Sequence, residues 1–128
     1  DTVATVIAMA LTYLNYAREK RAFFSLMWED HGQMQPERQN LAHKSRGFSL
    51  LLASVEAHLV TERPKSLTAE DRKAALTVAT QLWALAHGVA TLESNQLLDL
   101  FDASARAEAI LAEAASALLA GIDTVCNT

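Results

Sequence analysis

The sequence predicts an all-α protein, a bundle of about five helices that forms one domain over residues 1–128. Of the 128 residues, 51% are hydrophobic, and only four are Gly and two are Pro. This composition suits packed helices better than a sheet. Apolar residues recur at steps of three and four along most of the chain, which is the spacing of one helix face. A chain of this length buries a sizeable core, so no second domain is required.

The first two helices are expected over about residues 2–19 and 22–28. The first carries a stripe at alternating steps of four and three, formed by Val3, Ile7, Ala10, Leu14 and Ala17. In the second, aromatic residues and Met are too dense for one face, which predicts a short and nearly buried helix.

A third helix is expected over about residues 36–62, because Pro36 suits a first helical turn and Pro64 follows the end as a stop signal. His58 and Glu62 lie four apart on it without a third ligand, so we assign them to a solvated face and not to a metal site. The apolar stripe of this helix comprises Leu41, Ser45, Phe48, Leu52, Val55 and Leu59.

The fourth helix is expected over about residues 68–94 and the fifth over about residues 102–122. Thr68 suits the N-cap of the fourth helix, with Asp71 at the capping-box position, and Asp102 is the expected cap of the fifth. The apolar side of the fifth helix comprises Ala107, Ile110, Leu111, Ala114, Leu118 and Gly121.

The fourth helix, which is otherwise mostly small and apolar, contains three residues of another kind, Trp83, His87 and Gly88. Trp83 and His87 are four residues apart, so their rings share a helix face, with Gly88 beside them. A Gly in a helix interior costs on the order of 1 kcal/mol relative to Ala. Gly88 therefore predicts a close backbone approach or a kink at this point.

The fourth and fifth helices carry apolar residues on more than one face, and a core of this size need not bury them all. We therefore expect the two helices to form an isologous four-helix interface with a second copy of the chain. The predicted interface residues are Leu85, Val89, Leu92, Ile110, Ala114, Ala117, Leu118 and Gly121.

Composition and charge exclude several classes of protein. The net charge is −4 and no Lys/Arg cluster repeats along a face, so the chain is not expected to bind DNA by itself. No Glu-x-x-His pair, phosphate loop or nucleophile elbow is present, and we expect neither an enzyme nor a cofactor or metal. Cys126 is the only cysteine, which fits a reducing cytoplasm. The apolar runs are too short or too polar for a membrane span.

Trp83 and the His87-Gly88 pair lie in a long apolar helix that continues as Ala-Thr-Leu-Glu over residues 90–93. This pattern resembles the Trp-His-Gly type of C-terminal domain in TetR/AcrR-family transcriptional regulators. The order of helices agrees over nearly the whole chain. The resemblance implies the effector-binding and dimerisation domain of a regulator of the repressor type. The family's N-terminal helix-turn-helix domain is not visible, so we read the chain as a piece of a longer protein that contacts DNA only through that missing domain.

A small, largely apolar effector is expected to bind between the helices, where apolar side chains and a few polar groups would face it. The candidate ligand-binding residues are Met9, Tyr13, Phe24, Met27, Trp28, Phe48, Leu52, Val55, Trp83 and His87. Core packing is the alternative for most of the apolar residues in this set, and a structural hydrogen bond is the favoured alternative for His87.

Two other functions remain open from the sequence. A helical carrier or sensor of small molecules would share the pocket without a DNA-binding domain. A purely structural dimerisation module would have a solid core and no cavity.

Overall fold

The computed structural model describes residues 1–19, 46–62 and 67–126, and in this part the chain is entirely helical. The four helices are α1 (Thr2–Glu19), α4 (Arg46–Glu62), α5 (Ala69–Ser94) and α6 (Ala107–Cys126). The predicted all-α class is confirmed. The expected short helix at residues 22–28, with Phe24, Met27 and Trp28, lies outside the described residues, as does the first part of the expected third helix.

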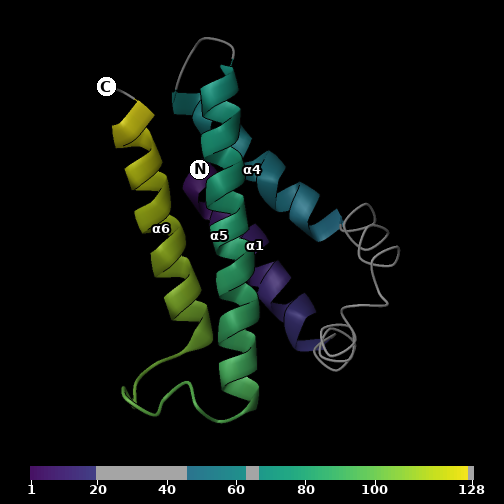
Figure 1. The fold of residues 1–128 in the computed structure, drawn as a ribbon, viewed down its shortest axis with the longest axis vertical. Helices are drawn as coiled ribbons and strands as arrows, with labels where there is room; N and C mark the ends of the chain where they lie inside the picture. The colour runs from purple at the N-terminus through teal and green to yellow at the C-terminus, as the bar shows by residue number, and fades with distance from the viewer. Residues whose placement is uncertain (20–45, 63–66, 127–128) are drawn as a thin grey trace, which may run out of the picture.

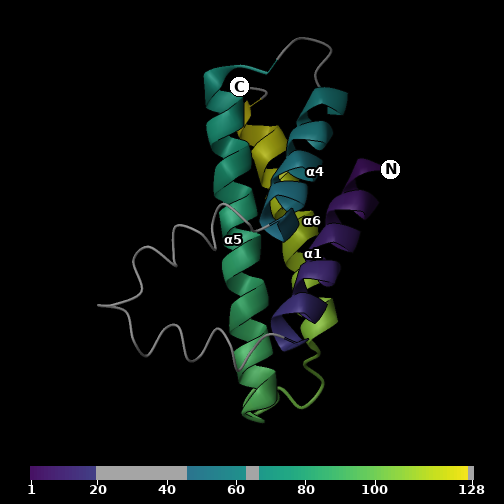
Figure 2. The ribbon, with the colours of Figure 1, turned by 90° about the vertical axis from the view of Figure 1, so that its right-hand side faces the viewer.

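The described helices form one bundle in which α1 contacts α4, α5 and α6. Helices α5 and α6 run in opposite directions and are joined by residues 95–106 at one end of the bundle (Figure 1). Seen from the side, α1 and α4 lie on the same side of α5 (Figure 2). The bundle therefore places α1 against every other described helix.

The core is formed by one buried stripe from each helix. In α1 the centre of the stripe is Val6, Ala10, Leu14 and Ala17, whereas Val3 and Ile7 are only partly buried. The buried positions of α4, α5 and α6 are Leu51, Val55, Leu59, Ala75, Val78, Ala79, Leu82, Ala86, Val89, Ala90, Ala107, Leu111, Ala115, Leu119 and Ile122.

The predicted stripe of the third helix agrees with the buried face of α4 at Val55 and Leu59, but not at Phe48 and Leu52. Leu51 is fully buried, while its neighbours Phe48 and Leu52 are half-buried at the edge of the core. His58 is 2% exposed, so its assignment to a solvated face was wrong. Its Nδ1 atom lies 2.8 Å from the hydroxyl of Thr2, which supplies a polar partner from α1.

The start of α5 agrees with the sequence. The Thr68 hydroxyl accepts a hydrogen bond from the backbone N–H of Asp71, and the Asp71 carboxylate accepts one from the backbone N–H of Thr68, both at 3.0 Å. This reciprocal pair satisfies donors that an uncapped helix leaves unpaired. The predicted capping box is confirmed.

The start of α6 differs from the prediction. Asp102 does not cap the helix, which begins at Ala107. Its carboxylate accepts hydrogen bonds from the backbone N–H and the hydroxyl of Ser104, at 3.0 and 2.7 Å. An Asp side chain bonds a turn two residues ahead as readily as a helix terminus, and here the turn forms. The helix also extends past residue 122, to Cys126.

Gly88 does not mark a close backbone approach among the described residues. Helix α5 is continuous through it, and a Cβ atom added there would meet nothing within 4 Å. Helix α5 is also long and apolar enough to cross a membrane by length and composition, but 44% of the relevant window is buried inside the bundle. One such helix is weak evidence for a membrane span, because the core helices of bundles pass the same test.

Candidate functional site

Four of the predicted ligand residues form an aromatic cluster where α1, α4 and α5 meet. The Phe48 and Trp83 rings are perpendicular, with centroids 6.4 Å apart. The His87 ring lies edge-on to Trp83 at 5.2 Å and to Tyr13 at 5.3 Å. Edge-to-face contacts of this kind orient aromatic side chains as well as burying them. The spacing of Trp83 and His87 was visible in the sequence, but their neighbours on α1 and α4 were not.

Tyr13, the member of this cluster from α1, is only 4% exposed. Its hydroxyl accepts a hydrogen bond from the indole Nε1–H of Trp83 at 2.8 Å. Its ring lies against the backbone of Gly47, where an added Cβ would approach two ring carbons to 2.9 Å. A buried Tyr needs a polar partner. Trp83 of α5 supplies a donor to the hydroxyl oxygen of Tyr13.

His87 is 8% exposed, and as a member of the aromatic cluster it contacts both Tyr13 and Trp83. Burial lowers the pKa of its imidazole from the ordinary value, because the charged form loses hydration. The ring is therefore held neutral at neutral pH. Its backbone carbonyl accepts a hydrogen bond of 2.9 Å from the Thr91 hydroxyl.

An open groove with a volume of about 530 Å³ lies on the outer face of α5. Ala84 and Gly88, one helical turn apart, form its floor because neither has a side chain beyond Cβ. The described residues that line the groove are Trp83, Ala84, His87, Gly88, Thr91 and Leu92. Its size falls within the roughly 300–1,000 Å³ range of small-molecule sites. None of these residues carries a charge at neutral pH, so the groove suits an uncharged, largely apolar molecule.

The other predicted ligand residues in the described part lie away from this groove. Met9 and Leu52 are half-buried and pack against the core, and Val55 is fully buried in it. Sequence reasoning missed the contribution of Ala84 to the groove and assigned Leu92 only to the dimer interface. The four-residue spacing of Ala84 and Gly88, two small residues on one face, was the available signal.

The predicted interface residues occupy the flanks of α5 and α6. Leu85, Ile110, Ala114 and Leu118 are half-buried, and Leu92, Ala117 and Gly121 are exposed. Val89 differs from these, because it is 3% exposed and belongs to the core of the bundle. It is therefore not available to a second copy in this arrangement.

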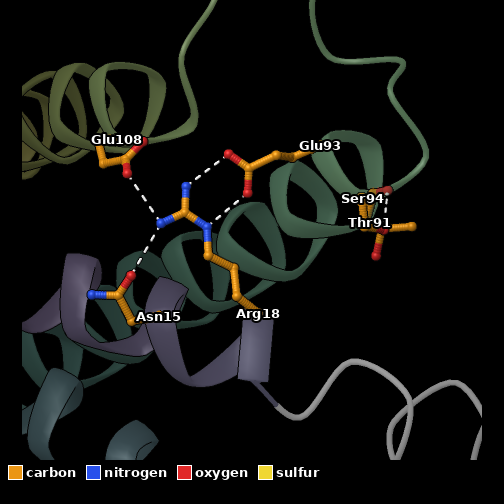
Figure 3. Close-up of polar contacts among 6 residues, drawn as sticks. All are labelled: Asn15, Arg18, Thr91, Glu93, Ser94 and Glu108. Atoms are coloured by element: carbon orange, nitrogen blue, oxygen red, sulfur yellow. Dashed lines mark hydrogen bonds and ion pairs between the residues drawn. The ribbon is translucent and has the colours of Figure 1, made fainter.

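A charged network that sequence analysis missed joins α1 to α5 and α6 (Figure 3). The Arg18 guanidinium donates two hydrogen bonds of 2.7 Å to the Glu93 carboxylate, and it lies 3.0 Å from Glu108. It also donates to the side chain of Asn15 at 3.0 Å. Hydrogen bonds to Glu93 and Glu108 raise the pKa of Arg18, and the bond from Arg18 lowers the pKa of Glu108. The network fixes the C-terminal end of α1.

The described residues contain no group of three or more His, Cys, Asp or Glu side chains placed to hold a metal ion. His58 contacts Thr2, and Glu93 forms an ion pair with Arg18. Both pairs join α1 to a neighbouring helix.

Comparison with known protein families supports a regulatory domain. The family model described as "Tetracyclin repressor-like, C-terminal domain" matches residues 6–118. Neither the comparison with curated proteins nor the one with solved structures finds a match. The family match covers most of the chain, including every residue of the groove and of the aromatic cluster. The chain therefore belongs to the family of tetracyclin repressor-like C-terminal domains.

Proposed function

We propose that this chain is the ligand-sensing and dimerisation domain of a cytoplasmic transcriptional repressor, and that the groove on α5 binds a small, largely apolar effector. The observation that carries the proposal is the open space above Gly88. A Gly in an exposed helix interior costs about 1 kcal/mol relative to Ala, and no packing within the described part offsets this cost. An effector seated above the groove floor would use the space that a side chain would fill.

The walls of the groove match such an effector. Trp83 and Leu92 supply apolar surface, and almost none of the surface that faces the groove is polar. Burial of apolar area drives association, so the groove favours a molecule with few polar groups on the face that it buries. An effector shifts the protein between two arrangements only if it binds one of them better. Its effect on DNA would pass through a DNA-binding domain attached ahead of α1.

The groove is tested with Nile red, a neutral and flat apolar fluorophore. We expect Nile red to bind the wild-type chain with increased fluorescence and to raise its melting temperature. Gly88→Leu fills the groove floor and should weaken binding at least tenfold, while the folded state is retained because Leu has the higher helix propensity. The matched control is Thr77→Leu, an exposed position on α5 outside the groove. Equal binding by the wild-type chain and Gly88→Leu would contradict the proposed site.

The dimer is proposed to form through the outer flanks of α5 and α6. On α6, Ile110, Ala114, Ala117 and Gly121 follow one another at steps of four and three beside the core-facing stripe. Small residues at this spacing allow a second helix to approach closely. The partner would be a second copy packed as an isologous four-helix interface, with Leu85 and Leu92 contributing from α5.

Sedimentation velocity at micromolar concentration tests the dimer. We expect the wild-type chain to sediment as a dimer and Ala117→Glu as a monomer, because a carboxylate at the interface would be desolvated without a partner. Ala109→Glu places the same charge on another exposed part of α6 and should remain dimeric. A wild-type monomer at this concentration would refute the interface.

A further inference from the structure

We propose that the Trp83–Tyr13 pair is the link through which occupancy of the groove acts on α1. This inference rests on the proposed function, because it assumes an effector in the groove. It adds the identity of the residues that carry the signal, which neither the family match nor the groove itself supplies.

Trp83 has two roles in one rigid side chain. It is half-exposed and lines the groove, while its only hydrogen-bond donor points to the Tyr13 hydroxyl at 2.8 Å. A molecule bound in the groove therefore contacts the same indole that holds α1. Any change of the Trp83 rotamer on binding would lengthen or break the bond to Tyr13.

Tyr13 has little room to absorb such a change. The Gly47 backbone of α4 lies against one part of its ring, and the His87 ring lies edge-on 5.3 Å away on α5. His87 also lines the groove, so a bound molecule contacts two of the neighbours of Tyr13. Closely packed interiors transmit displacement because they contain few voids. When Trp83 moves, Tyr13 therefore has to move with it, and α1 shifts relative to α5.

Further polar contacts of α1 among the described residues lie at its two ends, and of their partners Glu93 directly follows the groove residue Leu92. Thr2 is within 2.8 Å of His58 on α4, and Arg18 binds Glu93 and Glu108. None of these five residues lines the groove. They hold α1 to the bundle, whereas the Tyr13 contact in the second half of α1 joins it to the groove wall.

Tyr13→Phe tests the link, because it removes the hydroxyl and keeps the ring. Two quantities are measured with Nile red, its affinity by fluorescence titration and the amide hydrogen exchange of α1 with and without the dye. In the wild-type chain, saturation should change α1 exchange about fivefold or more, the lower end of typical coupling between sites. In Tyr13→Phe the change should fall below about twofold, with affinity kept within about threefold.

The matched control is Tyr16→Phe, which removes a hydroxyl from a partly exposed Tyr on the same helix. It should keep the wild-type exchange response. A purely structural role of Tyr13 would raise α1 exchange equally in free and bound protein and leave the ratio unchanged.

The outcomes separate the two proposals. If Nile red binds and Gly88→Leu abolishes binding, but Tyr13→Phe retains the full exchange response, the link is overturned and the effector site stands. If Nile red does not bind the wild-type chain, or Gly88→Leu binds it equally, the site fails and the link fails with it. If Tyr13→Phe loses the α1 exchange response to Nile red while Tyr16→Phe keeps it, both the effector site and the link are supported.

Discussion

Gly47 of α4 and Tyr13 of α1 are in such close contact that a Cβ atom on Gly47 would lie 2.9 Å from two carbons of the Tyr13 ring. Carbon atoms do not approach this closely, so the ring or a helix would have to move. Gly47→Ala is therefore expected to lower the free energy of unfolding by about 1–3 kcal/mol, as overpacking does. Urea unfolding monitored by circular dichroism measures the change.

Two further variants separate this clash from the general effect of replacing Gly. Gly88→Ala, at a helical position where a Cβ meets nothing within 4 Å, should stabilise the fold without effector by up to about 1 kcal/mol. In a Tyr13→Ala background, Gly47→Ala should cost nothing, because the clashing ring is gone. A persistent cost in that background would exclude the ring contact as the cause.

Burial of His87 predicts a loss of stability in mild acid. Its pKa is lowered in the folded protein from an ordinary value of 6.5, so the unfolded chain binds a proton at a higher pH than the folded one. The stability that the neutral ring contributes is fully present above about pH 6.5, the ordinary pKa of the unfolded chain. It decreases as the pH falls from there through the pKa of the folded protein. Unfolding free energies measured in urea from about pH 7 to about pH 5 should decrease accordingly.

His87→Phe keeps an aromatic ring at this position and removes the titrating group. Its unfolding free energy should depend less on pH over the same interval than that of the wild-type chain. The other histidines are unchanged in the variant, so the difference between the two curves belongs to residue 87. Parallel curves would show that His87 does not contribute.

Arg18→Met should weaken the attachment of α1 to α5 and α6, because it removes the guanidinium and keeps an apolar stem. The side chains involved are partly exposed, at 28% for Arg18 and 38% for Glu93, so solvent screens the interaction. We expect a loss of about 0.5–1.5 kcal/mol of unfolding free energy, above a typical surface pair because the contact is bidentate. The loss should shrink in about 1 M salt. Arg72→Met, at an exposed site on α5, is the control and should change stability little.

Gln96→Gly should stabilise the protein. Gln96 follows the end of α5 with φ of 59°, in the left-handed region, and Leu97 N–H donates to the Leu92 carbonyl at 2.8 Å. Glycine adopts this conformation without the steric cost of a Cβ. The expected gain in unfolding free energy is about 0.5–1 kcal/mol, since part of the left-handed cost is offset by the greater flexibility of Gly in the unfolded chain. Gln96→Ala removes the same side chain without relieving the backbone and should give no gain.

Much of the helical framework follows from local signals. The apolar spacing of residues 2–19 and the capping box of Thr68 and Asp71 predicted α1 and α5 with the bounds that the structure shows. The prediction that Asp102 caps α6 was wrong, because an Asp side chain can bond a turn as well as a helix terminus. The two uses look alike in a sequence. Local patterns identify a polar cap without saying which backbone it satisfies.

The candidate site was only partly predictable. Trp83 and His87 were found because their four-residue spacing is a property of one helix. Gly88 was noticed but given the wrong environment, since a sequence shows the absence of a side chain and not what surrounds the gap. The buried state of His58 was missed because its partner, Thr2, is on another helix.

The sequence by itself therefore determined that the chain is all-α, where α1 and α5 lie, and which family the Trp-His-Gly pattern resembles, because spacing, capping and composition act within one helix. Only the tertiary structure decided that Trp83 bonds Tyr13, that Arg18 joins Glu93 and Glu108, and that Gly88 opens a groove. Each of these depends on how one helix is rotated and placed against another. That choice is made by the packing of the whole core, and no single stretch of sequence encodes it.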